Sequence, residues 1–154
     1  MNFMLTKLYL ASGNSHKIRE LQELVSNTDL KFEVLSAAEV GGMPKVVEDT
    51  GTFVGNARKK ALALKALLPS GSWALADDSG ICVDALEGAP GVESAYFAGE
   101  ESDDQANLAK LVMCMHDVPR EQRGAHYVCV LILLSPDNQE FHFEAKCEGT
   151  LADE

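Results

Sequence analysis

The segment 73–86 constrains the fold most strongly, because it places two adjacent acids between two apolar runs. Its sequence is Trp-Ala-Leu-Ala-Asp-Asp-Ser-Gly-Ile-Cys-Val-Asp-Ala-Leu, and the adjacent acids are Asp77 and Asp78. The apolar runs predict a pair of strands, with the acids where the first strand ends. Successive side chains of a strand point to opposite faces, so we expect Asp77 and Asp78 to have different roles. A polar turn formed by Asp-Asp-Ser-Gly is the alternative.

Length and composition predict one globular domain over residues 1–154. The chain is 46% hydrophobic and 24% charged, which is ordinary for such a domain. Its net charge of −11 argues against non-specific nucleic-acid binding, which needs clustered lysine and arginine. No apolar run reaches the roughly 20 residues that span a bilayer, and the first residues lack the pattern of a signal peptide. We therefore expect a cytoplasmic protein that binds neither nucleic acid nor membranes.

Strand and helix patterns alternate in the first half of the chain, and two strands pair near its end. Ser15 and Thr52 are the expected N-caps of the first two helices. This order predicts an α/β fold in which a mixed, twisted sheet is flanked by helices. Besides 73–86, the expected strands are residues 8–11, 31–35, 127–134 and 141–148, and the expected helices are residues 15–25, 52–68 and 102–115.

The loop between the first strand and the first helix is a candidate anion site. A strand, a glycine-containing loop and a helix together aim backbone N–H groups and the positive helix end at an anion. Lys17, in the first helical turn, can add a full positive charge. A capped loop with a solvated lysine is the alternative, because the sequence matches no established phosphate-loop pattern. The candidate residues are Ser12, Gly13, Asn14, Ser15, His16 and Lys17.

Glu48 and Asp78 are candidate ligands for a divalent cation. Both are expected where a strand gives way to a loop, and ligands of open α/β sheets collect outside such strand ends. Carboxylate oxygens suit Mg²⁺, and a carboxylate can accept a proton from an attacking water. The basic cluster Arg58-Lys59-Lys60 is interpreted as a solvated helix face, with a phosphate contact as the alternative. These patterns predict metal-dependent phosphate chemistry without selecting the bond that is broken.

Several short blocks stand in a fixed order along the chain: 12–17, 48–53, 56–57, 76–80, 83–86, 88–91 and 94–95. Together they resemble the Ham1/RdgB family of inosine/xanthosine triphosphate pyrophosphatases, over residues 8 to about 148. The resemblance implies the ITPase-like (Maf/Ham1) fold. It also implies Mg²⁺-dependent hydrolysis of non-canonical purine nucleoside triphosphates (ITP, dITP, XTP) to the monophosphate and pyrophosphate. A homodimer that cleanses the nucleotide pool is implied as well.

The resemblance also assigns roles to individual residues. It makes Asp78 the proton acceptor and a magnesium ligand, and Glu48 the second magnesium ligand. The loop Ser12 to Lys17 becomes the triphosphate-binding loop, and Ser79 becomes a substrate contact. Asp77 is expected to support Asp78.

The sequence departs from the family pattern at three places. Gly55 stands where the family usually has Glu, and Tyr96 stands where it usually has Arg. The family pattern also continues past Leu151 with segments expected to recognise the base, so the C-terminal part of the fold is expected to be missing. A non-catalytic nucleotide-binding module and a Maf-type pyrophosphatase of other base preference are the alternative functions.

Overall fold

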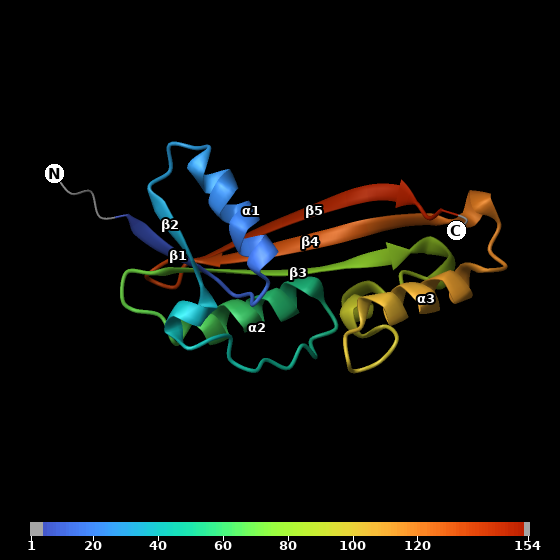
Figure 1. Ribbon diagram of the computed structural model, residues 1–154, viewed down its shortest axis with the longest axis horizontal. Helices are drawn as coiled ribbons and strands as arrows, with labels where there is room; N and C mark the ends of the chain where they lie inside the picture. Colours follow the sequence, from blue (N-terminus) through green and yellow to red (C-terminus); the bar gives the residue numbers. More distant parts are fainter. Residues whose placement is uncertain (1–4, 153–154) are drawn as a thin grey trace. The chain divides into compact units, whose positions relative to one another are not determined.

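The computed structural model describes residues 5–152 and confirms an α/β fold with a mixed five-stranded sheet (Figure 1). The strand order is β2-β1-β3-β4-β5. β1 runs parallel to both β2 and β3, whereas β4 turns directly into β5. The elements are β1 Thr6–Leu10, α1 Ser15–Ser26, β2 Phe32–Ser36, α2 Phe53–Lys65, β3 Trp73–Val83, α3 Asp104–Met115, β4 Gly124–Leu134 and β5 Glu140–Thr150. Short 3₁₀ turns lie at Ala37–Val40, Asp84–Leu86, Gly91–Tyr96 and Arg120–Gln122.

The described chain divides into two compact units. The first comprises residues 5–77 and 131–143, and the second comprises residues 78–130 and 144–152. The long strands β3, β4 and β5 contribute residues to both units. That residues 1–154 form a single domain stays a prediction.

The core of the first unit lies between α1 and the parallel strands. Leu10 of β1 lies opposite Leu75 of β3, and both are buried together with Leu8 and Val34. Because strand side chains alternate, these leucines share one face of the sheet and Tyr9 faces the other. Figure 1 shows α1 and α2 on opposite sides of these strands. The α1 side chains that cover the leucine face are Ile18, Leu21 and Val25.

The core of the second unit packs α3 against the ends of the long strands. Val83 and Met115 are buried there with Ala125. Arg123, whose exposed fraction is only 9%, closes this core with its guanidinium group. It donates hydrogen bonds to the carbonyl oxygens of Met115 (2.8 Å), Val118 (2.9 Å) and Ala152 (3.0 Å). One side chain therefore joins the end of α3 to the segment that follows β5.

Two predicted elements near the acids were wrong. Residues 73–83 form one continuous strand, so Asp77 and Asp78 lie inside β3 and not at a strand end. β1 pairs with β3 only as far as Leu75, and the strand continues past that point through both acids. Glu48 follows no strand either, because residues 43–49 have no regular secondary structure. Polar residues within β3 were misread as its end.

The last two strands form the predicted hairpin. The N–H of Ser135 donates to the carbonyl oxygen of Gln139 at 3.0 Å and closes the turn. The run 127–134 is apolar throughout, yet Tyr127 and Cys129 are exposed on either side of the buried Val128. In residues 5–152 no helix is long and apolar enough to cross a membrane.

Candidate active site

Lys17 and Asp77 form the closest ion pair of the predicted site. β1 lies parallel to β3 with Leu10 opposite Leu75, so the loop after β1 emerges beside Asp77. The first turn of α1 then brings Lys17 Nζ to 2.5 Å from Asp77 Oδ2. The Asp77 side chain is only 13% exposed and that of Lys17 is 43% exposed. Asp77 thus contacts the predicted triphosphate loop.

The predicted triphosphate loop uses part of its own hydrogen-bonding capacity internally. Asn14 is the N-cap of α1, in place of the predicted Ser15, which is the first helical residue. Asn14 Oδ1 accepts from the N–H groups of His16 (2.9 Å) and Lys17 (3.4 Å). Ser12 Oγ accepts from the N–H of Asn14 at 3.0 Å, and Gly13 lies exposed between them. The oxygens of Ser12 and Asn14 therefore accept hydrogen bonds from backbone N–H groups of the loop. These N–H groups were expected to face an anion.

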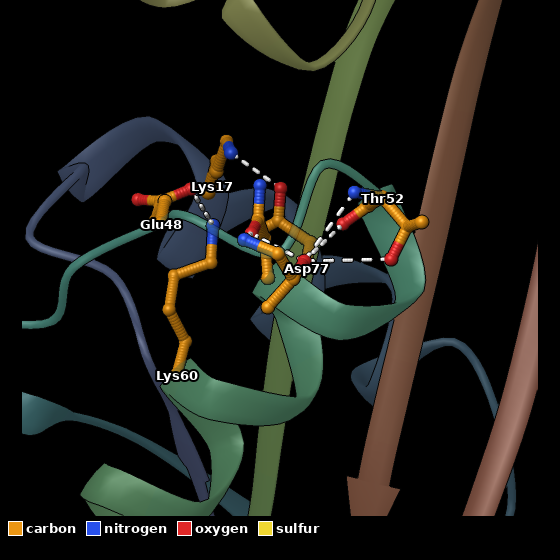
Figure 2. A network of polar contacts seen from close by, with 7 residues as sticks. Lys17, Glu48, Thr52, Lys60 and Asp77 are labelled. Carbon is orange, nitrogen blue, oxygen red and sulfur yellow. Dashed lines mark hydrogen bonds and ion pairs between the residues drawn. The ribbon is translucent and has the colours of Figure 1, made fainter.

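A second pair of opposite charges joins the loop before α2 to the body of that helix. Lys60 Nζ lies 3.4 Å from Glu48 Oε2, with side-chain exposures of 17% and 30%. One residue away on each side, Lys59 Nζ lies 2.5 Å from Asp49 Oδ1 at the surface. Hydrogen bonding from Lys59 lowers the pKa of the Asp49 carboxyl. Figure 2 shows Lys17, Glu48, Lys60 and Asp77 gathered beside the first turns of α2.

The loop that carries Glu48 is anchored to α2 by a buried amide. Asn56, which is 1% exposed, accepts with Oδ1 from the N–H (3.2 Å) and the hydroxyl (2.8 Å) of Thr50. Thr52 is the predicted N-cap, and its hydroxyl accepts from the N–H of Gly55 at 3.0 Å. A Cβ atom at position 55 would lie 2.7 Å from Thr50 Cβ and 2.8 Å from Thr52 Oγ1. In this chain the Thr50 side chain fills the space that a larger residue at position 55 would need.

Asp78 and Ser79 belong to the second unit. Asp78 is 7% exposed and lies on the face of β3 opposite to Asp77, as the pleat predicted. Ser79 is exposed and lines a cavity of about 300 Å³ in the second unit. Tyr96 is 47% exposed. The structure thus gives Lys17, Glu48, Lys60 and Asp77 a common location in the first unit.

The donor atoms present fit a hard divalent cation. Within residues 5–152 no three or more His, Cys, Asp or Glu side chains are grouped to hold a metal. Mg²⁺ is commonly bound by one or two carboxylates together with water and substrate phosphates, so a group of three is not required. The Glu48 carboxylate is accessible, and its 3.4 Å contact with Lys60 is longer than the about 2.7–2.9 Å of a strong charged hydrogen bond. Glu48 can therefore offer an oxygen ligand.

Lys60 is the residue that the sequence interpretation underrated. It was placed with Arg58 and Lys59 on a solvated helix face, yet the three side chains have different partners. Arg58 binds Glu140 and Lys59 binds Asp49, whereas Lys60 is 17% exposed and contacts Glu48. The available signal was helical spacing: Lys60 lies four residues after the buried Asn56 and so on nearly the same helix face.

Comparison with known proteins gives one consistent result. The sequence profile of the Ham1 family matches residues 8–154. A protein of Opitutus terrae named dITP/XTP pyrophosphatase is 56% identical over 149 residues, which cover 94% of this chain and 73% of that protein. A protein of the same name from Desulforamulus reducens is 46% identical, over 94% of this chain and 70% of that protein.

Solved structures agree with the sequence relatives. The Ham1 protein of Staphylococcus aureus superposes with a TM-score of 0.81 at 33% identity, covering 96% of this chain and 72% of that one. A HAM1 protein from Coxiella burnetii gives a TM-score of 0.83 at 33% identity, with 98% and 75% coverage. The fold expected from the resemblance is confirmed.

Proposed function

Because the chain belongs to the Ham1 family, we propose that it hydrolyses non-canonical purine nucleoside triphosphates such as ITP, dITP and XTP to the monophosphate and pyrophosphate. The observation that carries this proposal is the identity of 56% and 46% to relatives named dITP/XTP pyrophosphatase. Two lysines and two carboxylates gathered beside α2 offer the chemistry that a metal-bound triphosphate needs.

The lysines of the site bind the phosphates, and the carboxylates are the candidate metal ligands. Lys17 and Lys60 bind phosphate oxygens as point charges. Glu48 and Asp78 are the residues that would serve as Mg²⁺ ligands, and the metal would neutralise phosphate charge. Asp78 accepts the proton of the water that attacks the α-phosphorus, and the bond to the bridging oxygen of pyrophosphate breaks. Ser79, exposed next to Asp78, contacts the substrate.

We further propose a cytoplasmic homodimer that binds neither nucleic acid nor membranes. The family resemblance supports the dimer, and the net charge of −11 disfavours contact with nucleic-acid phosphates. Light scattering after size-exclusion chromatography measures the mass directly, and a monomeric mass at micromolar concentration would refute the dimer.

The direct test of the reaction is product analysis. Purified protein is incubated with dITP or XTP and Mg²⁺, and the phosphate products are separated. We expect pyrophosphate and the nucleoside monophosphate in equal amounts, with ATP and GTP hydrolysed far more slowly. Orthophosphate as the first product would refute the reaction, and saturable binding without turnover would support a nucleotide-binding module instead.

Asp78→Asn tests the proposed base. The amide keeps the size of the side chain but cannot accept the proton, so kcat should fall by about 10²–10⁴-fold while the circular dichroism spectrum is unchanged. Asp84→Asn is the control, because Asp84 lies outside the site, in the 3₁₀ turn after β3. Activity of Asp78→Asn close to that of the unmodified protein would show that another group accepts the proton.

A further inference from the structure

Each lysine of the site contacts a carboxylate. Lys17 contacts Asp77 and Lys60 contacts Glu48. The two pairs differ in geometry, because Nζ to oxygen is 2.5 Å in the first and 3.4 Å in the second. The Lys60–Glu48 pair is the looser contact, and it involves the residue proposed as a metal ligand.

We propose that the Lys60 ammonium occupies Glu48 in the metal-free protein and competes with the divalent cation for this carboxylate. Metal binding to Glu48 then releases Lys60, which turns to the phosphates of the substrate. This inference rests on the proposed function, since it takes Glu48 as a metal ligand.

The surrounding structure permits such an exchange with little rearrangement. The backbone of Lys60 is fixed, because α2 is held by the buried residues Ala57, Ala61 and Leu64. Glu48 is carried by the loop that the Asn56 amide anchors through Thr50. The lysine stem is flexible, and a cation of higher charge can take the place of the ammonium group at the Glu48 carboxylate.

Exchange at Glu48 couples the two ligands of the enzyme. Metal at Glu48 frees Lys60 for phosphate, and phosphate that draws Lys60 away frees Glu48 for metal. Such coupling is reciprocal, so each ligand strengthens the binding of the other.

The test measures metal binding in the absence of nucleotide, with Mn²⁺ as the probe and free Mn²⁺ followed by electron paramagnetic resonance. Lys60→Gln should bind Mn²⁺ about tenfold more tightly than the unmodified protein, because a competing positive charge within a few ångströms is removed. Lys60→Met should give the same gain. Lys59→Gln is the matched control, because it removes the same charge from the neighbouring residue, whose partner is Asp49.

The outcomes separate this inference from the proposed function. A tighter Mn²⁺ complex in Lys60→Gln, with no change in Lys59→Gln, supports the exchange. Unchanged or weaker binding in Lys60→Gln, or equal gains in both variants, overturns it. Glu48→Gln isolates the premise: if it leaves Mn²⁺ affinity unaltered, then Glu48 is not a ligand. If Glu48→Gln weakens binding and Lys60→Gln does not strengthen it, only the competition by Lys60 fails.

Discussion

At the scale of single residues, Asp77 contacts the predicted triphosphate loop. Its carboxylate lies 2.5 Å from Lys17 Nζ, and its expected support of Asp78 stays a prediction. A largely buried carboxylate that fixes an exposed lysine reduces the number of positions the ammonium can adopt. We infer that Asp77 positions Lys17 for the triphosphate, and that it takes no part in proton transfer.

Replacing Asp77 should therefore weaken substrate binding more than it slows chemistry. Asp77→Asn is expected to raise KM about tenfold and to change kcat little, because a misplaced Lys17 contributes less to binding. Steady-state kinetics of Asp77→Asn, Lys17→Met and the double variant check this. The two single effects should not add, since both act through one contact. Strict additivity, or a loss of kcat as large as in Asp78→Asn, would contradict the role.

The sequence could predict which residues have side chains suited to binding phosphate or metal, but not which side chains they contact. Alternation along a strand assigns Asp77 and Asp78 to different faces, because the pleat is a local property. The pairing of Lys17 with Asp77 spans 60 residues and depends on the parallel register of β1 and β3. The contact of Lys60 with Glu48 was not predicted for the same reason, because it depends on the course of the irregular loop 43–52.

At the scale of elements, an ion pair fastens α2 to the start of β5. Arg58 donates to Glu140 through Nε (2.8 Å) and through a terminal nitrogen (2.7 Å), which is a two-bond arrangement. The Arg58 hydrogen bonds hold the pKa of the Glu140 carboxyl below its ordinary value. Both side chains are partly exposed, so solvent screens the pair and its contribution to stability is about 1 kcal/mol or less.

This pair predicts a pH dependence of stability with a definite sign. A depressed carboxyl pKa stabilises the fold above the pKa of the unfolded chain, and the contribution is lost as the pH falls through the folded value. Glu140→Gln should therefore lower the Tm by a few degrees at pH 7, and the difference from the unmodified protein should shrink as the pH falls below the ordinary glutamate pKa. Thermal melts between pH 3 and pH 7 measure this. A Tm difference that persists at pH 3 would assign the effect to packing.

Elements with clean periodicity were predictable, and interrupted ones were not. The hairpin of β4 and β5 follows from alternation, and the helices α1 and α2 follow from helical periodicity, with the N-cap predicted correctly for α2 only. β3 was divided in error, because two acids, a serine and a glycine look like a turn when their neighbours are unknown. The place of β3 inside the sheet overrides that local preference, and the neighbours of a strand cannot be read from the segment itself.

At the scale of the whole molecule, the second unit depends on one buried arginine. Arg123→Met should reduce the free energy of unfolding by about 3 kcal/mol or more, since three backbone carbonyl groups lose a charged donor. Urea denaturation followed by circular dichroism measures the change. Arg120→Met is the control, because Arg120 is exposed in the adjacent 3₁₀ turn. Equal losses in the two variants would show that the carbonyl contacts add no stability.

The mixed sheet was within reach of the sequence, whereas the division into two units was not. Helix and strand patterns specify a mixed sheet through local chemistry. The unit boundary cuts through three strands, and one of its crossings falls between Asp77 and Asp78. Which half of a strand joins which core depends on contacts between distant segments, and no composition change marks those positions.

The uninterrupted course of β3 has a consequence for how this gene can change. Inserting or deleting one residue ahead of the acids would turn every later side chain of the strand to the opposite face. Asp78 would then point where Asp77 now meets Lys17, and the buried residues that follow would be exposed. Substitutions along β3 change one side chain at a time, whereas an insertion or deletion changes the facing of all later ones. The number of residues from Trp73 to Val83 should therefore be the same in related proteins.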